Sequence, residues 1–295
     1  MRNPAFCAYE IKMRAIFVDL YQEYGLPKPA DGGGTLQCWI QDISPAISAR
    51  RSCPAVLVIP GGGYHHVSDR EGEPVALRFL AAGYSAFVLT YSVAPCRYPV
   101  ALREAAMAMR YIRENAEAFG IDPHMVAATG FSAGGHLCGC LGTLFDCPEL
   151  ADFGGPELLR PDALGLCYPV AVSWGNTHEG SFRNLCGEDE ALRRRLSLDA
   201  LVRPDMPPVF LWHTRNDESV PVRNSLLLAQ ALDARGIEFA MHIYRNGCHG
   251  LSTADAQVYP VGAVPAHSWD VPDWIRAEIR FFEEIGMKIR DLEGK

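Results

Sequence analysis

The stretch 125-MVAATGFSAGGH-136 decides how this chain folds. An apolar, strand-like run ends in the pattern G-x-S-x-G at Gly130–Gly134, and residues of helical character continue to Phe145. A strand, a tight turn and a helix in this order expose the hydroxyl of the central serine, Ser132. Small residues flank the serine because the backbones of strand and helix pass close together. A glycine-rich turn without chemistry is the alternative, since such a short pattern also arises by chance.

Short apolar runs alternate with helical patterns on both sides of this stretch. Candidate strands are Thr35–Ile40, Ala55–Ile59, Ala86–Thr90, Val126–Thr129, Ala163–Cys167, Val209–His213 and Ala240–Tyr244. One candidate helix opens at Pro74, a longer one follows Pro99, and two more cover Leu226–Ala234 and Trp274–Ile285. The alternation predicts an α/β protein with a mostly parallel central sheet and helices on both faces, a three-layer sandwich.

The repeating unit is too even for two separate folds. Residues 35–295 are therefore expected to form one domain, with a short insertion at about 168–208. Residues 1–34 have no clear period, and Pro27, Pro29 and Gly32–Gly34 are typical of irregular chain. The sequence predicts an irregular N-terminal arm over these 34 residues.

Composition excludes some classes of protein. A net charge of -8 argues against a nucleic-acid partner, which needs clustered Lys and Arg. No run of 18 apolar residues and no secretory signal is visible, so we expect no membrane partner and a cytoplasmic location. The ten cysteines fit that compartment if they are reduced, and Cys138 and Cys140 are expected to pack a helix. The oligomeric state stays open, a homo-oligomer included.

A serine hydroxyl becomes a good nucleophile only when a base takes its proton, so a histidine and usually a carboxylate should follow. His249 lies between Gly247 and Gly250, just beyond the candidate strand Ala240–Tyr244. Asp217 lies just beyond the candidate strand Val209–His213. Because parallel strands bring their carboxyl ends to one edge of a sheet, Ser132, Asp217 and His249 are expected to meet there as a catalytic triad.

Other residues compete for these roles. Glu218 could replace its neighbour Asp217, but its side chain should point away. Asp255 follows His249 and therefore has the wrong order in the chain. His213 precedes the acid and is expected to be a strand-end residue near the site, and His136 is expected to pack or cap the helix after Ser132.

An attack on an acyl carbonyl creates an oxyanion that needs preorganised N–H donors. One donor is expected from the backbone of Ala133, the residue after the serine. The others are expected from Pro60-Gly61-Gly62-Gly63-Tyr64, where glycines let the backbone approach a substrate. A phosphate-binding loop is the alternative, but this run lacks the G-K-[ST] ending of a P-loop.

These motifs together resemble a known group. The run PGGGY at 60–64, SDRE at 68–71, EPVA at 73–76, GFSAGGH, the Asp217 segment and Cys248-His249-Gly250 are similar to bacterial esterases of the α/β-hydrolase superfamily, in the acetyl-xylan-esterase-like branch. The resemblance covers roughly residues 35 to 286 and implies the α/β-hydrolase fold. It also implies Gly62 and Gly63 as oxyanion donors, whereas Pro60 stands where related enzymes carry a histidine.

Four further residues are candidates for substrate binding. Tyr64, His65, His66 and Trp174 have side chains that suit stacking on sugars and hydrogen bonds to hydroxyls. The paired histidines could instead bind a metal, but no acidic partner stands at ligand spacing. A packing or surface role is the alternative for each of the four, and neither a metal nor a cofactor is expected.

The sequence therefore predicts a serine carboxylic ester hydrolase that removes short acyl groups, with acetylated sugars or xylo-oligosaccharides as substrates. A serine peptidase of the prolyl-oligopeptidase type shares fold and triad and is the second hypothesis. A non-catalytic binding protein on a hydrolase fold is the third.

Overall fold

The computed structural model describes residues 13–41, 51–260, 262, 263, 265 and 271–291. Eight of its strands form one sheet in the order β1-β2-β4-β3-β5-β6-β7-β8, and β9 pairs with the start of β3. The strands are β1 (Arg14–Asp19), β2 (Thr35–Ile40), β3 (Arg51–Ile59), β4 (Ser85–Thr90), β5 (Ile121–Phe131), β6 (Ala163–Cys167), β7 (Val209–Thr214), β8 (Phe239–Tyr244) and β9 (Arg290–Asp291).

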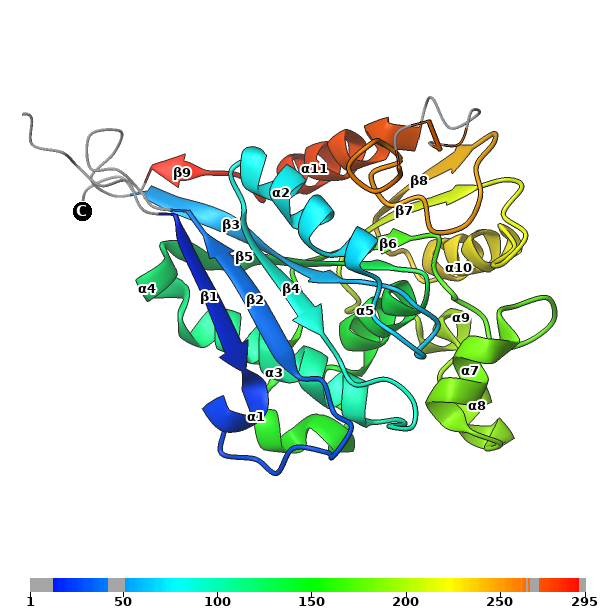
Figure 1. Cartoon of the computed structure of the whole chain (residues 1–295), viewed down its shortest axis with the longest axis horizontal. Coiled ribbons are helices and arrows are strands. Elements are labelled where there is room, and N and C mark those ends of the chain that lie inside the picture. The colour runs from blue at the N-terminus through cyan, green and yellow to red at the C-terminus, as the bar shows by residue number, and fades with distance from the viewer. Residues whose placement is uncertain (1–12, 42–50, 261, 264, 266–270, 292–295) are drawn as a thin grey trace, which may run out of the picture.

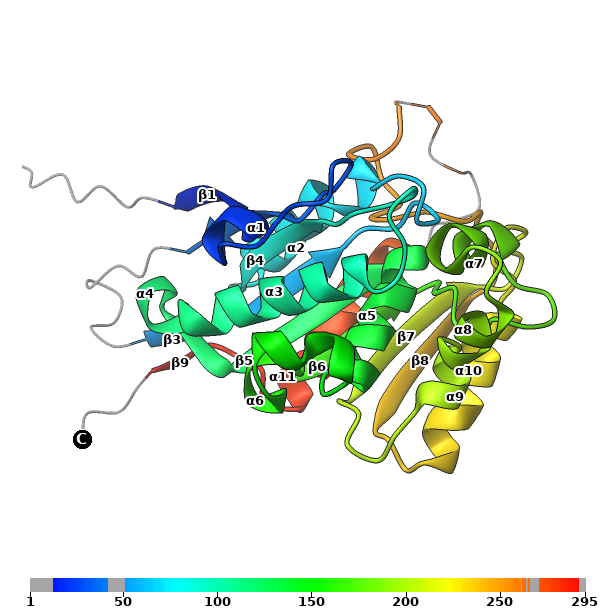
Figure 2. The same ribbon diagram turned by 90° about the horizontal axis from the view of Figure 1, so that it is seen from below.

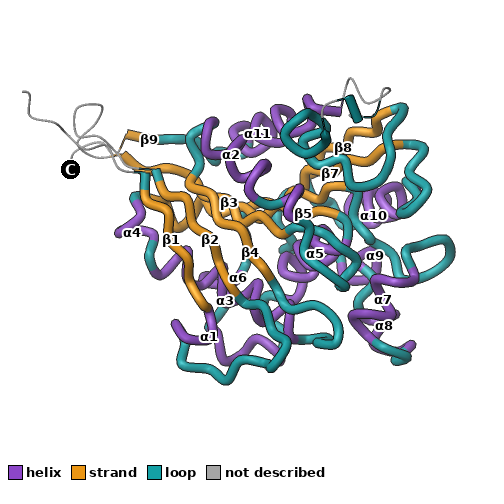
Figure 3. The backbone as a smooth tube through the Cα atoms, viewed as in Figure 1, coloured by secondary structure: helices purple, strands orange, loops and turns teal. Residues whose placement is uncertain are grey.

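Most of the sheet is parallel. Strands β4, β3, β5, β6, β7 and β8 pair in parallel, while β2 runs antiparallel to both β1 and β4. Figure 3 shows the strands as one twisted sheet with helices packed on it. The strands β3 to β7 are buried on both faces, which explains their near-continuous runs of apolar residues.

Helices cover both faces of this sheet. The longer ones are α2 (Glu73–Ala81), α3 (Val100–Glu114), α5 (Ala133–Leu144), α10 (Arg223–Ala234) and α11 (Trp274–Glu284). Residues of α3, α5 and α10 share one apolar cluster, and residues of α2 and α11 share another on the opposite face. Figure 2 shows α3 and α5 in front of the strands and α11 behind them. The predicted three-layer α/β sandwich is confirmed.

The shorter helices lie at the ends and edges of the sheet. They are α1 (Leu20–Glu23), α4 (Ala116–Phe119), α6 (Pro156–Leu159), α7 (Glu179–Cys186), α8 (Glu190–Arg195) and α9 (Leu198–Leu201), with short 3-10 turns at Asp69–Glu71, Pro148–Phe153 and Val271–Asp273. Helices α7, α8 and α9 form the segment between β6 and β7, where the sequence predicted an insertion at about 168–208 (Figure 1).

The prediction of an irregular arm over residues 1–34 is wrong where the structure describes it. Arg14–Asp19 is an edge strand in antiparallel register with β2, and Leu20–Glu23 is a short helix capped by the side chain of Asp19. An edge strand can leave much of its surface in water, and Phe17 is 74% exposed. The consecutive apolar residues Ile16, Phe17 and Val18 therefore show no alternation that a sequence could reveal. Residues 1–12 lie outside the described part.

Two further sequence expectations concern cysteines and membranes. Cys138 and Cys140 lie buried on α5 inside the apolar cluster, so their packing role is confirmed. The thiols of Cys138 and Cys140 are free. Within the described residues, every helix is too short or too polar to cross a bilayer.

Candidate active site

The serine lies on a strained turn between β5 and α5. Ser132 has a φ of 54°, a left-handed conformation that non-glycine residues rarely adopt. The turn is tight enough that a Cβ at Gly134 would lie 2.2 Å from the carbonyl oxygens of Ile59 and Pro60, so only glycine fits there. The backbone of Ser132 is fixed by donation to the Cys167 carbonyl at 2.9 Å. Backbone strain held by such contacts is a common property of functional sites.

Two loops at the carboxyl ends of β7 and β8 meet this serine. His249 Nε2 lies 2.8 Å from Ser132 Oγ, and His249 Nδ1 lies 2.6 Å from Asp217 Oδ2. The side chain of Asp217 is completely buried, whereas that of His249 is 19% exposed. The three predicted triad residues thus form one continuous hydrogen-bonded chain that ends at the serine hydroxyl.

The carboxylate of Asp217 is held by four groups. Its Oδ1 accepts hydrogen bonds from the backbone N–H groups of Ser219 and Val220, both at 2.9 Å. Its Oδ2 lies 2.6 Å from His249 Nδ1 and 3.4 Å from His213 Nε2. Burial opposes ionisation, but the hydrogen bonds from His213 and His249 outweigh it and lower the pKa of Asp217 below its usual range. The group is therefore a fixed anion that can orient His249 and stabilise its protonated form.

The glycine run after β3 faces the serine from the other side. Gly62 and Gly63 line the same pocket as Ser132, and both have positive φ angles, 122° and 65°. Their carbonyl groups are occupied: that of Gly62 accepts from His65 and His66, and that of Gly63 accepts from Asn184 Nδ2. Ala133 is the first residue of α5, so its N–H has no acceptor within the helix. These three residues can present backbone donors beside Ser132.

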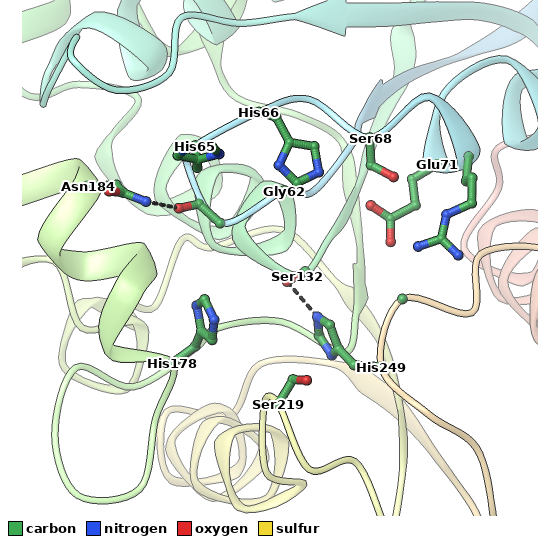
Figure 4. A pocket seen from close by; sticks show the side chains of 13 residues that line it. Gly62, His65, His66, Ser68, Glu71, Ser132, His178, Asn184, Ser219 and His249 are labelled. Carbon is green, nitrogen blue, oxygen red and sulfur yellow. Dashed lines mark hydrogen bonds between the residues drawn. The ribbon is translucent and has the colours of Figure 1, made fainter.

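The pocket above Ser132 is small and polar. Its volume is about 330 Å³. Figure 4 shows His65, His66, Ser68 and Glu71 on one side of Ser132, and His178 and Ser219 on the other. The residues that line it are Gly62, Gly63, His65, His66, Ser68, Arg70, Glu71, Ser132, His178, Asn184, Ser219, His249 and Gly250.

Two of the four predicted substrate-binding residues are placed elsewhere. Tyr64 has a φ of 55°, which turns its ring into the core, where its hydroxyl lies 2.8 Å from His136 Nδ1. Trp174 is 45% exposed and does not line the pocket; its indole N–H donates to Asp199 at 3.0 Å. Both predictions are therefore wrong, whereas His65 and His66 lie on the rim of the pocket.

The residues that competed for the triad roles are also placed. His213 is buried, with its ring nitrogens 2.7 Å from Ser225 Oγ and 2.8 Å from the Val220 carbonyl oxygen. His136 is buried in α5, and burial lowers its pKa to about 4, so it remains neutral. Glu218 is exposed to solvent. These positions agree with the roles that the sequence predicted for His213, His136 and Glu218.

Sequence reasoning missed part of the pocket. His178 precedes α7, where its Nδ1 lies 2.8 Å from Ser181 Oγ, and burial together with the charge of His249 lowers its pKa. Asn184 on α7 holds the glycine loop, and Ser219 follows Asp217. His178 and Asn184 come from the segment between β6 and β7, which carries no motif, so no sequence signal could have selected them. Among the described residues, no three His, Cys, Asp or Glu side chains are grouped to hold a metal.

Two family models match separate parts of the chain. The BD-FAE model matches residues 42–153, which include the glycine run and Ser132, and the prolyl oligopeptidase family model matches residues 173–266, which include Asp217 and His249. A crystal structure of an acetyl ester-xyloside bifunctional hydrolase from Caldicellulosiruptor lactoaceticus is 37% identical, with a TM-score of 0.81. The match covers 95% of this chain and 99% of that chain.

Two longer proteins are also similar. An endo-1,4-beta-xylanase B from Butyrivibrio fibrisolvens is 41% identical over 71% of this chain and 34% of that protein. An acetylxylan esterase from Xylanibacter ruminicola is 28% identical over 75% of this chain and 44% of that protein. The chain therefore spans less than half the length of these two curated relatives.

The parallel sheet and the serine on its strained turn define the class of this protein as a serine-type α/β hydrolase. Within that class, the chain belongs to the family of bacterial esterases that includes the acetyl ester-xyloside hydrolase.

Proposed function

We propose that this protein is a serine carboxylic ester hydrolase that removes acetyl and other short acyl groups from acylated sugars or xylo-oligosaccharides. The observation that carries the proposal is the hydrogen-bonded chain from Asp217 through His249 to Ser132, which ends in a small polar pocket. Gly62 and Gly63 line the same pocket and Ala133 follows the serine, which supports a site that combines nucleophile, base and oxyanion donors.

The geometry supports an acyl-enzyme mechanism. As Ser132 Oγ attacks the acyl carbonyl carbon, His249 Nε2 takes the hydroxyl proton, and Asp217 stabilises the imidazolium that forms. The oxyanion of the tetrahedral intermediate accepts hydrogen bonds from the N–H groups of Gly62, Gly63 and Ala133. His249 then gives its proton to the departing sugar oxygen. Water, activated by the same histidine, releases the acid and restores Ser132.

Two observations favour an acetylated carbohydrate. The pocket of about 330 Å³ is lined by imidazole, hydroxyl and amide groups that suit sugar hydroxyls, with His65 and His66 at its rim. The names of two relatives refer to acetylxylan and to acetyl ester-xyloside hydrolysis. The proposed partner is thus a small acylated carbohydrate; the cytoplasmic location and the oligomeric state stay predictions from the sequence.

A peptidase activity is the second candidate, because residues 173–266 match the prolyl oligopeptidase family model. The two activities differ in the bond that they break, so a substrate panel decides between them. Purified protein and its Ser132→Ala variant should be assayed on acetylated xylo-oligosaccharides, aryl acetates and dipeptide amides. We expect release of acetate that depends on Ser132 and no amide cleavage. Cleavage of the amides alone would favour the peptidase, and failure of a fluorophosphonate probe to label Ser132 would favour a binding protein.

A further inference from the structure

Two loops must keep a fixed spacing in the proposed mechanism, and this inference rests on that mechanism. The glycine loop after β3 supplies oxyanion donors, and the loop after β8 supplies His249. A buried carboxylate and a buried tyrosine, Glu71 and Tyr168, lie between these loops. Neither residue has a role in the proton transfers described above.

Glu71 is anchored to the glycine loop. It ends the 3-10 turn Asp69–Glu71 and is only 2% exposed, although it lines the pocket. Its Oε2 accepts a hydrogen bond of 2.8 Å from the N–H of Gly61, the residue directly before Gly62. The position of Gly61 therefore depends on this carboxylate.

The second oxygen of Glu71 is anchored to the histidine loop through Tyr168. Its Oε1 accepts a hydrogen bond of 2.7 Å from the Tyr168 hydroxyl, and that hydroxyl accepts one of 3.0 Å from the N–H of Ser252. Burial raises the pKa of Tyr168, so its hydroxyl keeps the proton that it donates. Its ring also packs edge-on against the ring of His249, with centroids 5.1 Å apart.

The backbone conformations of two residues in this series of hydrogen bonds also support a functional role. Tyr168 and Ser252 have φ angles of 38° and 51°, both in the left-handed region that is costly for residues with a Cβ. Such conformations persist where the surrounding contacts fix them, and they concentrate at functional sites.

We propose that Glu71 and Tyr168 are positioning residues, which fix the spacing between the oxyanion donors and His249 through one hydrogen-bonded chain from Gly61 to Ser252. Transition-state stabilisation is sensitive to displacements of about 1 Å, whereas binding of a small substrate is much less so. Loss of these hydrogen bonds should therefore slow the chemical step more than it weakens the binding of substrate.

The first test is Glu71→Gln. Gly61 and Tyr168 each donate to one carboxylate oxygen, whereas an amide offers one oxygen and one NH2 group, so the Tyr168 hydroxyl must change from donor to acceptor and both charge-assisted bonds are weakened or lost. We expect kcat on an aryl acetate to fall about 10- to 100-fold, with KM changed by less than about threefold. Tyr168→Phe, which removes a single oxygen atom, should behave alike and carries the test if Glu71→Gln fails to fold. The double variant should be about as slow as the slower single variant, because both substitutions interrupt the same series of hydrogen bonds.

Glu104→Gln is the matched control. Glu104 is also fully buried and also accepts hydrogen bonds from a backbone N–H, that of Ser92, and from a tyrosine hydroxyl, that of Tyr21. It does not line the pocket. We expect its variant to lower the melting temperature and to leave kcat unchanged. All assays should run well below the melting temperature of each variant.

The outcomes separate the inference from the proposed function. A kcat for both Glu71→Gln and Tyr168→Phe that matches the Glu104→Gln control would overturn the positioning role. Independent losses that multiply in the double variant would also overturn it, because two separate effects would then be acting. A wild-type protein without esterase activity would instead reject the proposed function.

Discussion

Ser132 Oγ and His249 Nε2 lie 2.8 Å apart although 117 positions separate them in the chain. We expect Ser132→Ala to lower kcat/KM for ester hydrolysis about 10⁶-fold, because the hydroxyl forms the covalent bond. The fold should remain intact, since the side chain contributes chemistry rather than packing. Steady-state kinetics and circular dichroism of the variant check both points, and near-normal turnover would end the assignment of the nucleophile.

The other two members of the triad should differ in severity. His249→Ala should be about as damaging as Ser132→Ala, since no other base reaches the serine in the described structure. Asp217→Asn should cost about 10⁴-fold and leave more residual activity, because the acid orients the imidazole and does not itself react. Activities measured side by side test this order; an Asp217→Asn variant more damaged than His249→Ala would contradict it.

The length of the acyl chain should limit the rate. The large apolar residues Phe182 and Leu185 of the segment between β6 and β7 are buried in the core, and neither lines the pocket. A buried methylene gains about 0.8 kcal/mol only where apolar surface receives it, so longer chains should gain little. We expect kcat/KM on aryl esters to peak between acetyl and butyryl. Assays from C2 to C12 decide the point, and a maximum at C8 or beyond would refute it.

Chelation should leave the rate unchanged. In the proposed mechanism Ser132 supplies the nucleophile, His249 the base, and backbone N–H groups the stabilisation of the oxyanion, so no Lewis acid is needed. Dialysis against a chelator, followed by an assay with an aryl acetate, checks this expectation. A loss of activity that zinc or calcium specifically restores would show that a metal takes part.

Stability should fall with rising pH because of Glu278. This residue of α11 is fully buried, close enough to the sheet that a Cβ at Gly165 would lie 1.9 Å from its Oε1. Within the described residues, neither carboxyl oxygen has a hydrogen-bond partner of normal geometry. Burial raises the pKa of Glu278 from 4.5 to about 8, and the nearby Thr129 hydroxyl offsets this only partly. The folded protein therefore holds a proton that the unfolded chain has released between these two pH values.

In this window the unfolded state binds fewer protons, so the free energy of unfolding should decrease by about 1 kcal/mol per pH unit. Glu278→Gln should remove the decrease and be more stable than the wild type at pH 8. Urea unfolding at pH 5 and pH 8 measures both effects. Glu283→Gln, an exposed position of the same helix, is the control and should keep the wild-type dependence. An equal dependence in Glu278→Gln would assign the effect to other groups.

The sequence was most informative where residues are buried or where a motif has a strict backbone requirement. Thr35–Ile40 and Ala163–Cys167 were predicted with the bounds that the structure shows, and the strained turn at Ser132 was readable because only small residues fit around it. Both depend on local constraints, which periodicity and composition reveal directly.

The errors concern orientation and contacts between distant segments. Tyr64 follows the glycine run, but its positive φ turns the ring into the core, which sequence cannot show. Trp174 is an aromatic residue of the type that stacks on sugars, yet its ring lies under the guanidinium of Arg223 and outside the pocket. His178 and Ser219 reach the pocket only because the strands β6, β7 and β8 bring their loops together.

The segment between β6 and β7 contacts the pocket through His178 and Asn184, yet it contributes none of the three side chains of the triad. The triad and this wall of the pocket are therefore encoded in separate stretches of the gene. Recombination between relatives within residues 173–204 would exchange one wall of the pocket and leave Ser132, Asp217 and His249 in place. Such an arrangement lets one wall of the pocket change during evolution while the triad stays the same.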